Sequence, residues 1–194
     1  MESIYADRLP ALKAVLDRLL DRVEQVRREL RSATGMDPVE HCLGRIKSEE
    51  SMREKCRRKG LPETTESALT QIHDAVGIRV VTSFIDDVYR IRDALAGMEG
   101  IRVVEEKDYI RHAKPNGYRS YHMVLLVDEQ IYAEIQLRTI SQDTWAALEH
   151  HMRYKKTLNG NTALIAQELK RCADELASTD VSMQTIRDMI MGQS

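Results

Sequence analysis

Two sequence periods alternate along this chain, and their order limits the fold to a few architectures. Apolar residues recur every three or four positions in some segments, as in an amphipathic helix, and every second position in others, as in a strand. The last two strand-like segments, 118–127 and 131–138, are joined by a tight connection and should form an antiparallel hairpin. We therefore predict an α/β (α+β) fold with a mixed five-stranded sheet flanked by helices, not a doubly wound parallel sheet.

The predicted helices carry start and stop signals. A long helix spans residues 4–31 and ends at Thr34-Gly35. Ser48 should cap the next helix, because its side-chain oxygen can accept a hydrogen bond from an unpaired amide of the first turn. We give Ser141 the same role after the last strand. The other predicted elements are helices at 65–73, 86–97 and two within 161–191 after a break at Asn159-Gly160, and strands at 39–47, 77–84 and 101–106.

Composition bounds the class of protein. The 194 residues and 42% hydrophobic content fit one domain, 1–194, with a catalytic core at 36–156. A net charge of −2 argues against a generally basic nucleic-acid binder. The three cysteines are far apart, which disfavours disulfides and zinc sites. The N-terminus does not resemble a signal peptide, and no apolar run approaches the ~20 residues of a membrane span. We expect a cytoplasmic protein without membrane contact.

Basic residues are concentrated in one segment, 45–59, with seven basic and three acidic side chains. Arg45 and Lys47 share one face of a strand. Ser51, Lys55 and Arg58 share one face of the following helix. Cations, a hydroxyl and a helix N-terminus at one place suit a polyphosphate. A solvated charged helix is the alternative, and spacing alone favours it.

The segment HDAVGIRVV, residues 73–81, places Asp74 just before a strand on which Arg79 faces away from its apolar neighbours. His73-Asp74 also looks like the metal-binding pair of HD phosphohydrolases. That fold is all-helical, whereas a strand follows here at once. An aspartate that merely caps a helix or strand end stays open as the alternative.

The segment KPNGYRSYH, residues 114–122, begins with an Asn-Gly turn signal, at which both residues accept positive φ. Tyr118, Ser120 and His122 would then share one face of a strand, with Arg119 and Tyr121 on the other in structural roles. In YAEIQLRT, residues 132–139, Glu134, Gln136 and Arg138 alternate with apolar residues.

The two polar sets would lie side by side on the hairpin. For one strand alone, a solvent-exposed sheet face is the favoured reading. Together with Asp74, however, they would bring two carboxylates to a basic rim, and such a pair suits Mg²⁺ that takes further ligands from phosphates. That arrangement is typical of phosphoryl transfer.

With these residues in view, the chain resembles the (p)ppGpp synthetase domain of RelA/SpoT-type proteins, and most of all the small alarmone synthetases. Five blocks carry the resemblance, in the family's order: GRIKSEESMREKCRRKG, DAVGIRVV, KDYIRHAKPNGYRSYH, EIQLRT and WAALEHHMRYK. The resemblance implies a nucleotidyltransferase-like synthetase fold. It also implies transfer of pyrophosphate from ATP to the 3′-hydroxyl of GDP or GTP, with GMP as a further acceptor to test.

The resemblance also implies roles for individual residues. Asp74 and Glu134 would bind Mg²⁺, and Glu134 would orient or deprotonate the 3′-hydroxyl. The residues implied in ATP binding are Arg45 and Arg79, on either side of adenine, and Lys47, Ser51, Lys55 and Arg58, on the phosphates. The residues implied in GDP or GTP binding are Lys107, Lys114 and His122, on the phosphates, and Tyr118, Gln136 and Asp143, on the nucleoside.

Other readings stay open. A different acceptor, such as an adenine nucleotide or tRNA, or a catalytically silent nucleotide- or RNA-binding module would also fit parts of the pattern. The apolar stripes of the terminal helices could pack together or form a homo-oligomer, and relatives are often tetramers. Single-stranded RNA or the alarmone is an expected regulator. The 127–131 hairpin is shorter than in many relatives, and we expect no hydrolase or regulatory domain.

Overall fold

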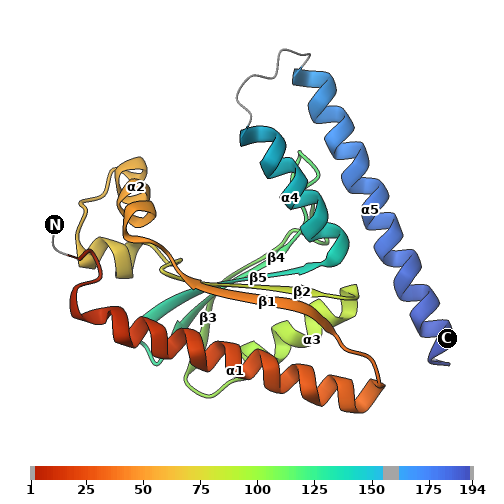
Figure 1. Cartoon of the computed structure of the whole chain (residues 1–194), viewed down its shortest axis with the longest axis horizontal. Coiled ribbons are helices and arrows are strands. Elements are labelled where there is room, and N and C mark those ends of the chain that lie inside the picture. Colours follow the sequence, from red (N-terminus) through yellow and green to blue (C-terminus); the bar gives the residue numbers. More distant parts are fainter. Residues whose placement is uncertain (1–2, 155–161, 193–194) are drawn as a thin grey trace.

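The computed structural model describes residues 3–154 and 162–192 (Figure 1). The helices and strands are, in chain order, α1 (Leu9–Thr34), β1 (Val39–Ile46), α2 (Glu49–Lys59), β2 (Val76–Thr82), α3 (Ile85–Ala96), β3 (Ile101–Asp108), β4 (Tyr121–Val127), β5 (Ile131–Thr139), α4 (Ile140–Tyr154) and α5 (Thr162–Ile190). A 3-10 turn, Ala6–Arg8, precedes α1, and a π-type turn, Ser67–Gln71, precedes β2. No helix in the described ranges is long and apolar enough to cross a membrane.

The strands form one mixed five-stranded sheet in the order β1-β2-β5-β4-β3, which confirms the predicted sheet. β2 and β5 pair in parallel, whereas β1–β2, β5–β4 and β4–β3 are antiparallel. The predicted tight connection between β4 and β5 is present, with Val127 directly opposite Ile131. The parallel pair lies inside the sheet, where both of its strands have neighbours on each side.

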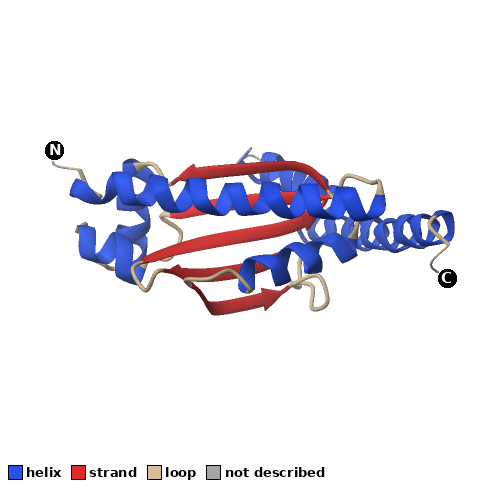
Figure 2. Ribbon diagram, turned by 90° about the horizontal axis from the view of Figure 1, so that it is seen from below, coloured by secondary structure: helices blue, strands red, loops and turns tan. Residues whose placement is uncertain are grey.

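Helices α1 and α3 lie across one face of the sheet (Figure 2). The apolar stripe of α1 is buried on it because side chains three and four positions apart point the same way. The buried residues of α1 are Leu12, Val15, Leu19, Val23 and Val26. They join alternate residues of the strands, such as Ile78, Met123 and Ile135, in one core. The opposite sheet face lies between α2 and α4 (Figure 1).

The ends of the helices agree in part with the predicted signals. Ser48 Oγ accepts a hydrogen bond from the Ser51 amide at 3.3 Å, as predicted for a helix cap. The Ser141 cap was wrong, since α4 begins one residue earlier. Thr139 Oγ1 accepts from the Gln142 amide at 3.2 Å, and Gln142 Oε1 accepts from the Thr139 amide at 3.2 Å. This reciprocal pair is a capping box.

The two predicted C-terminal helices are one continuous helix, α5. The polar run Ser178-Thr179-Asp180 looked like a break in the sequence. In the structure Asp180 is buried, and its Oδ2 accepts a 2.6 Å hydrogen bond from Thr139 Oγ1. Tertiary packing therefore keeps the helix continuous through residues of modest helix propensity. The predicted break at Asn159-Gly160 lies outside the described residues.

Other predicted boundaries were also wrong. The long helix predicted from residue 4 begins at Leu9, after the 3-10 turn Ala6–Arg8. The helix expected at 65–73 ends at Gln71, because Ile72 is already extended and its side chain is buried. Strand β4 begins at Tyr121, so Tyr118 and Ser120 lie before it. In the turn that precedes Tyr118, Gly117 has a φ of +90° while Asn116 does not take positive φ. Asn116 Oδ1 instead accepts from the Tyr118 amide at 3.2 Å.

Candidate active site

The candidate site is built from two rows of residues that cross the open face of the sheet. In one row Arg45 on β1 lies opposite Gly77 on β2, which lies opposite Glu134 on β5. In the next row Arg79 on β2 pairs with Gln136 on β5. The remaining partners in that row are His122 on β4 and Lys107 on β3. Because strand side chains alternate, all of these polar groups project from the same face.

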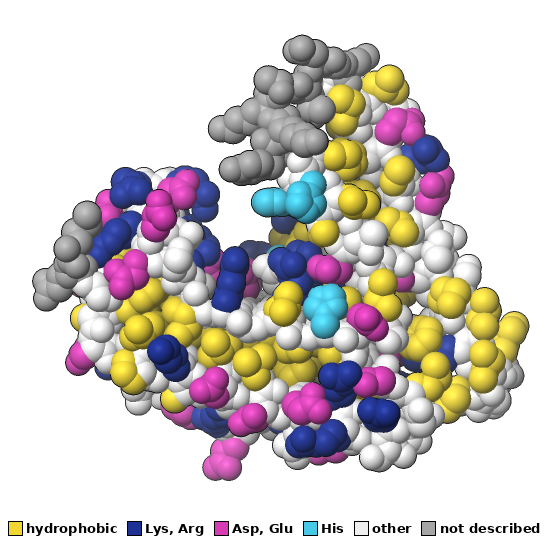
Figure 3. Space-filling model, in the orientation of Figure 1, with side chains coloured by type: hydrophobic (Ala, Val, Ile, Leu, Met, Phe, Trp, Pro, Cys, Tyr) yellow, Lys and Arg dark blue, Asp and Glu magenta, His cyan; other side chains and the backbone are white. Residues whose placement is uncertain are grey.

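A pocket opens over the β1–β2–β5 part of these rows. Six predicted site residues line it: Arg45, Lys47, Asp74, Arg79, Glu134 and Gln136. Figure 3 shows the molecule hollowed between α2 and α4, with lysine and arginine side chains along the floor and the α2 wall. The basic cluster thus faces a concave site, which argues against the alternative of a merely solvated charged helix.

Asp74 is held by two lysines at the entrance to β2. Its Oδ2 lies 2.6 Å from Lys55 Nζ and 2.9 Å from Lys47 Nζ. Burial alone raises the pKa of Asp74, but the hydrogen bonds from Lys55 and Lys47 outweigh it and hold the pKa below its ordinary value. The aspartate is therefore ionised at neutral pH and does more than cap a strand end.

The backbone around Lys47 fixes this arrangement. Its amide donates to the Ala75 carbonyl at 2.9 Å, next to Asp74 in the chain. Its carbonyl accepts a 2.6 Å hydrogen bond from the buried Tyr5 hydroxyl. The segment before α1 therefore supports the turn that carries the predicted phosphate-binding lysine.

Glu134 lies at the junction of the two predicted nucleotide sites. Its Oε1 is 3.8 Å from His122 Nδ1. The nearby imidazole lowers the pKa of Glu134, against burial and the negative charge of Asp74, which raise it; the net pKa is lowered. Both carboxylates are thus available in ionised form.

The two carboxylates fit a divalent cation. Asp74 Oδ1 is buried and has no hydrogen-bond partner among the described residues, although Oδ2 is doubly paired. An uncompensated carboxylate oxygen beside a second carboxylate is a suitable ligand pair for Mg²⁺. The described residues contain no cluster of three or more His, Cys, Asp and Glu that could hold a metal ion by themselves. A cation here would take its other ligands from water and substrate.

Tyr118, His122 and Lys114 form a second cluster beside Glu134. The Tyr118 hydroxyl is hydrogen-bonded to His122 Nε2 at 2.8 Å. Lys114 Nζ lies 4.8 Å from the centre of the Tyr118 ring and 4.4 Å from that of Tyr109. An aromatic ring next to a cation and an imidazole can receive a base and an anionic group together.

Arg138 has a central role in the site that the sequence did not reveal. Its side chain is only 7% exposed. It donates to the Tyr118 hydroxyl at 2.8 Å, to Gln136 Oε1 at 3.0 Å and to Asp143 Oδ1 at 3.1 Å. The period of two in residues 132–138 had placed Arg138 on the polar face but gave it no role.

Asp143 was predicted to contact the nucleoside of GDP or GTP, but it lies close to a residue predicted to bind ATP. Its Oδ1 is 3.6 Å from Arg79 Nη1, and its Oδ2 is 3.9 Å from His41 Nε2. Burial and the charge of Arg138 lower the pKa of Arg79, while Asp143 opposes this. His41 was not predicted to be a site residue. The sequence could have indicated it, because His41, Leu43 and Arg45 are alternate residues of β1 and so share one face.

Four predicted residues lie apart from these contacts or differ in role. Ser51 and Arg58 are on α2 but do not line the pocket, and Lys107 Nζ pairs with Glu105 at 2.7 Å. Ser120 was expected to line the pocket, which was wrong. It is fully buried, and its Oγ donates to the Leu137 carbonyl at 3.2 Å. Tyr121 is structural, as expected, and its hydroxyl donates to Glu106 at 2.9 Å.

The model of a protein family described as "Region found in RelA / SpoT proteins" matches residues 44–159, which include the Tyr118 cluster and every predicted site residue in the pocket. The chain belongs to the RelA/SpoT family. Among curated RelA/SpoT relatives, the GTP pyrophosphokinase YwaC of Bacillus subtilis is 37% identical over 94% of this chain and 90% of its own length. The GTP pyrophosphokinase YjbM of the same organism is 33% identical over 77% of this chain and 72% of its own.

The solved structures agree with the RelA/SpoT assignment. The small alarmone synthetase 2 from Bacillus subtilis superposes with a TM-score of 0.80 at 37% identity, covering 94% of this chain and 98% of that one. The small alarmone synthetase 1 from Bacillus subtilis, bound to its product pppGpp, also gives a TM-score of 0.80, at 28% identity, and covers 94% of this chain and 95% of that one. The predicted fold and family are therefore confirmed.

Proposed function

We propose that this chain is a GTP pyrophosphokinase, which transfers the β,γ-pyrophosphate of ATP to the 3′-hydroxyl of GDP or GTP and so makes (p)ppGpp. The observation that carries the proposal is the pair of ionised carboxylates, Asp74 and Glu134, between a lysine-rich wall and an aromatic cluster. The similarity to two GTP pyrophosphokinases and to a synthetase solved with pppGpp bound supports it.

The pocket side of the site would take ATP. Arg45 and Arg79 stand on neighbouring strands and can stack on the two faces of adenine through their planar guanidinium groups. Lys47 and Lys55, now paired with Asp74, would turn to the phosphates together with Ser51 and Arg58 of α2. Their Asp74 partner would then be free to ligate Mg²⁺ with Glu134. The bound ion would supply charge neutralisation to the phosphate oxygens.

The aromatic side would take the acceptor. Tyr118 would stack on guanine, and Lys107, Lys114 and His122 would hold its phosphates. Gln136 and Asp143 would place the nucleoside. Glu134 lies between the two sides. It would accept the proton of the acceptor's 3′-hydroxyl while the hydroxyl oxygen attacks the β-phosphorus of ATP. The bond from that phosphorus to the α–β bridging oxygen would break, and AMP would leave.

The decisive experiment is synthesis of (p)ppGpp by purified protein from ATP and Mg²⁺ with GDP, GTP or GMP. We expect Glu134→Gln and Asp74→Asn each to lower kcat at least about a hundredfold, because each removes a charge from the reacting centre. Thermal unfolding should show that both variants stay folded. A Glu134→Gln enzyme with the wild-type rate would contradict the proposed mechanism.

Assembly and location belong to the same proposal. A cytoplasmic homo-oligomer, such as a tetramer, agrees with the soluble-type composition and with the apolar outer face of α5, which is described below. Regulation by single-stranded RNA or by the product stays a prediction from the family resemblance.

A further inference from the structure

Residues 109–120 form a loop, here called the 109–120 loop, that carries Lys114 and Tyr118 outside the sheet. It joins β3 to β4 and enters β4 only at Tyr121. Within it, the Gly117 amide donates to the Lys114 carbonyl at 2.8 Å, and the Lys114 amide donates to the Tyr118 carbonyl at 3.1 Å. These bonds shape the turn. Its place relative to the sheet depends on other contacts, which include the bonds of Tyr118 to His122 and Arg138 and those to α5 described next.

Helix α5 lies directly behind this turn. A Cβ atom added to Gly117 would lie 2.7 Å from Ala173 Cβ and 3.2 Å from Lys170 Cα. Real Cβ atoms do not approach other atoms so closely, so only glycine permits this packing. The positive φ of Gly117 adds a second reason for glycine at this position.

Arg119 ties the two segments together. Its side chain is 18% exposed, and it donates to the Gly117 carbonyl at 3.1 Å and to the Ala173 carbonyl at 3.3 Å. It also donates to Asp174 Oδ1 at 2.9 Å, while Lys170 Nζ pairs with Asp174 Oδ2 at 2.6 Å. One guanidinium thus binds the backbone of the loop and both the backbone and a carboxylate of α5.

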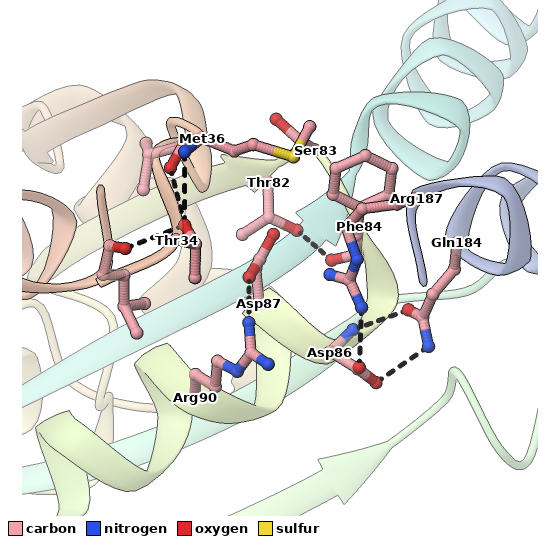
Figure 4. A network of polar contacts seen from close by, with 12 residues as sticks. Thr34, Met36, Thr82, Ser83, Phe84, Asp86, Asp87, Arg90, Gln184 and Arg187 are labelled. Carbon is pink, nitrogen blue, oxygen red and sulfur yellow. Dashed lines mark hydrogen bonds and ion pairs between the residues drawn. The ribbon is translucent and has the colours of Figure 1, made fainter. Parts of the chain in front are cut away.

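Other contacts hold α5 in place independently of the loop. Trp145 Nε1 of α4 donates to the Leu169 carbonyl at 2.8 Å, and Thr139 bonds Asp180 as described above. Near the end of α5, Arg187 and Gln184 both bond Asp86 at the start of α3, and Arg187 stacks on Phe84 (Figure 4). The helix is therefore a fixed support against which a loop can be positioned.

We infer that Arg119, paired with Asp174, is a positioning residue for the acceptor nucleotide, and that through it α5 helps to set the place of the loop that carries Tyr118. The inference rests on the proposed function. Removal of the pair would leave the loop in its binding position for only part of the time, and the apparent affinity for the acceptor falls in proportion to that fraction. ATP binding should not change, because its predicted ligands lie on β1, β2 and α2 and, for Lys47, in the turn between β1 and α2.

The chain offers a direct probe and a matched control. Trp145 is the only tryptophan in the sequence, and its ring centre lies 6.4 Å from that of Tyr118. Its fluorescence should therefore report GDP binding without turnover. Glu175, adjacent to Asp174, pairs with Arg171 within α5 on an exposed face. Glu175→Gln removes an α5 carboxylate without touching the loop.

The experiment compares wild type with Arg119→Ala, Arg119→Lys, Asp174→Asn and Glu175→Gln. We expect Arg119→Ala and Asp174→Asn to raise the GDP Kd and the GDP KM by about three- to tenfold, with the ATP KM within about twofold of wild type. Arg119→Lys should be intermediate, and Glu175→Gln should match wild type. Asp174→Asn alters a half-exposed side chain and should leave the fold intact. Its thermal unfolding curve would check this.

The outcomes separate this inference from the proposed function. An unchanged GDP Kd in both Arg119→Ala and Asp174→Asn would overturn the positioning role while leaving the proposed activity intact. Equal rises in the KM of GDP and ATP would also overturn it, since they indicate general damage. A wild-type protein that binds no guanine nucleotide would refute the proposed acceptor and, with it, the inference.

Discussion

Gly77 is the residue with no side chain in the middle of the pocket floor. It lies between Arg45 and Glu134 in register across the sheet. A Cβ there would meet no atom nearer than the Arg45 carbonyl oxygen at 3.9 Å, and Gly77 is not among the glycines with positive φ. Neither backbone conformation nor crowding therefore requires glycine. Because glycine has no side chain, the space above β2 at this position stays open.

We predict that Gly77→Val fills this space and raises the ATP KM by about tenfold or more. The fold should be kept or become more stable, because valine favours strands and glycine in a strand costs about 0.5–1 kcal/mol. Steady-state kinetics with ATP as the varied substrate, alongside thermal unfolding, would measure both effects. A normal ATP KM in a stable Gly77→Val enzyme would mean that the substrate does not pass over this strand.

Single residues were predictable where a period of two governs them. The alternation in residues 132–138 correctly placed Glu134, Gln136 and Arg138 on one face. The same reasoning was wrong for Ser120, which it placed in the pocket. β4 starts after Ser120, and the Ser120 hydroxyl bonds the backbone of β5 instead. The central place of Arg138 depends on groups from α4 and from the 109–120 loop, which no local pattern of β5 contains.

Among the elements, α5 departs most from its sequence pattern. It carries polar anchors, Asp174, Asp180 and Arg187, that bond the 109–120 loop, Thr139 at the end of β5 and Asp86 at the start of α3. In the sequence Asp180 belongs to the polar run between the two predicted helices, whereas Asp174 and Arg187 lie within those helices. The strands and α1–α3 were predictable because their burial follows their own periodicity, whereas α5 is held by partners distant in the chain.

We expect the buried carboxyl of Asp180 to make the α4–α5 junction sensitive to pH. Burial raises its pKa above the ordinary value, although hydrogen bonds from Thr139 and its neighbours oppose the rise. The folded state therefore holds this proton more tightly than the unfolded state. The resulting stabilisation is present below the unfolded pKa of about 3.9 and is lost as the pH rises through the folded pKa.

Asp180→Asn removes this titration and keeps an oxygen acceptor for Thr139. We predict that wild type loses stability relative to Asp180→Asn as the pH rises from about 4 towards neutrality. Paired thermal unfolding curves across that range would show a growing difference in Tm. A difference that stays constant with pH would mean that Asp180 does not titrate with a raised pKa.

At the scale of the whole molecule, the outer face of α5 is too apolar for a helix surrounded by water. Met183, Ile186 and Ile190 recur at spacings of three and four, and Ile190 is 75% exposed. Met189 beside it is 67% exposed. α1 packs on the sheet and leaves this face uncovered, so the second alternative from the sequence, contact with another subunit, is the one the fold favours.

We predict that the protein is a homo-oligomer and that Ile186→Glu with Ile190→Glu weakens its assembly. Charges at these positions would have to be desolvated in an apolar interface. Light scattering should give a mass well above 22.3 kDa for wild type and close to that value for the double variant. Wild type that is already monomeric at working concentration would contradict the prediction.

The parallel pairing of β2 with β5 has a consequence for how the chain acquires activity. Asp74 precedes β2, Glu134 lies on β5, and α3, β3, the 109–120 loop and β4 all intervene in the sequence. Contacts of such large sequence separation form late, because closing long loops costs entropy before any burial compensates for it. We therefore expect a nascent or partly folded chain to have a basic surface and separate carboxylates but no assembled active site. On this expectation, (p)ppGpp synthesis begins only when β5 is in place.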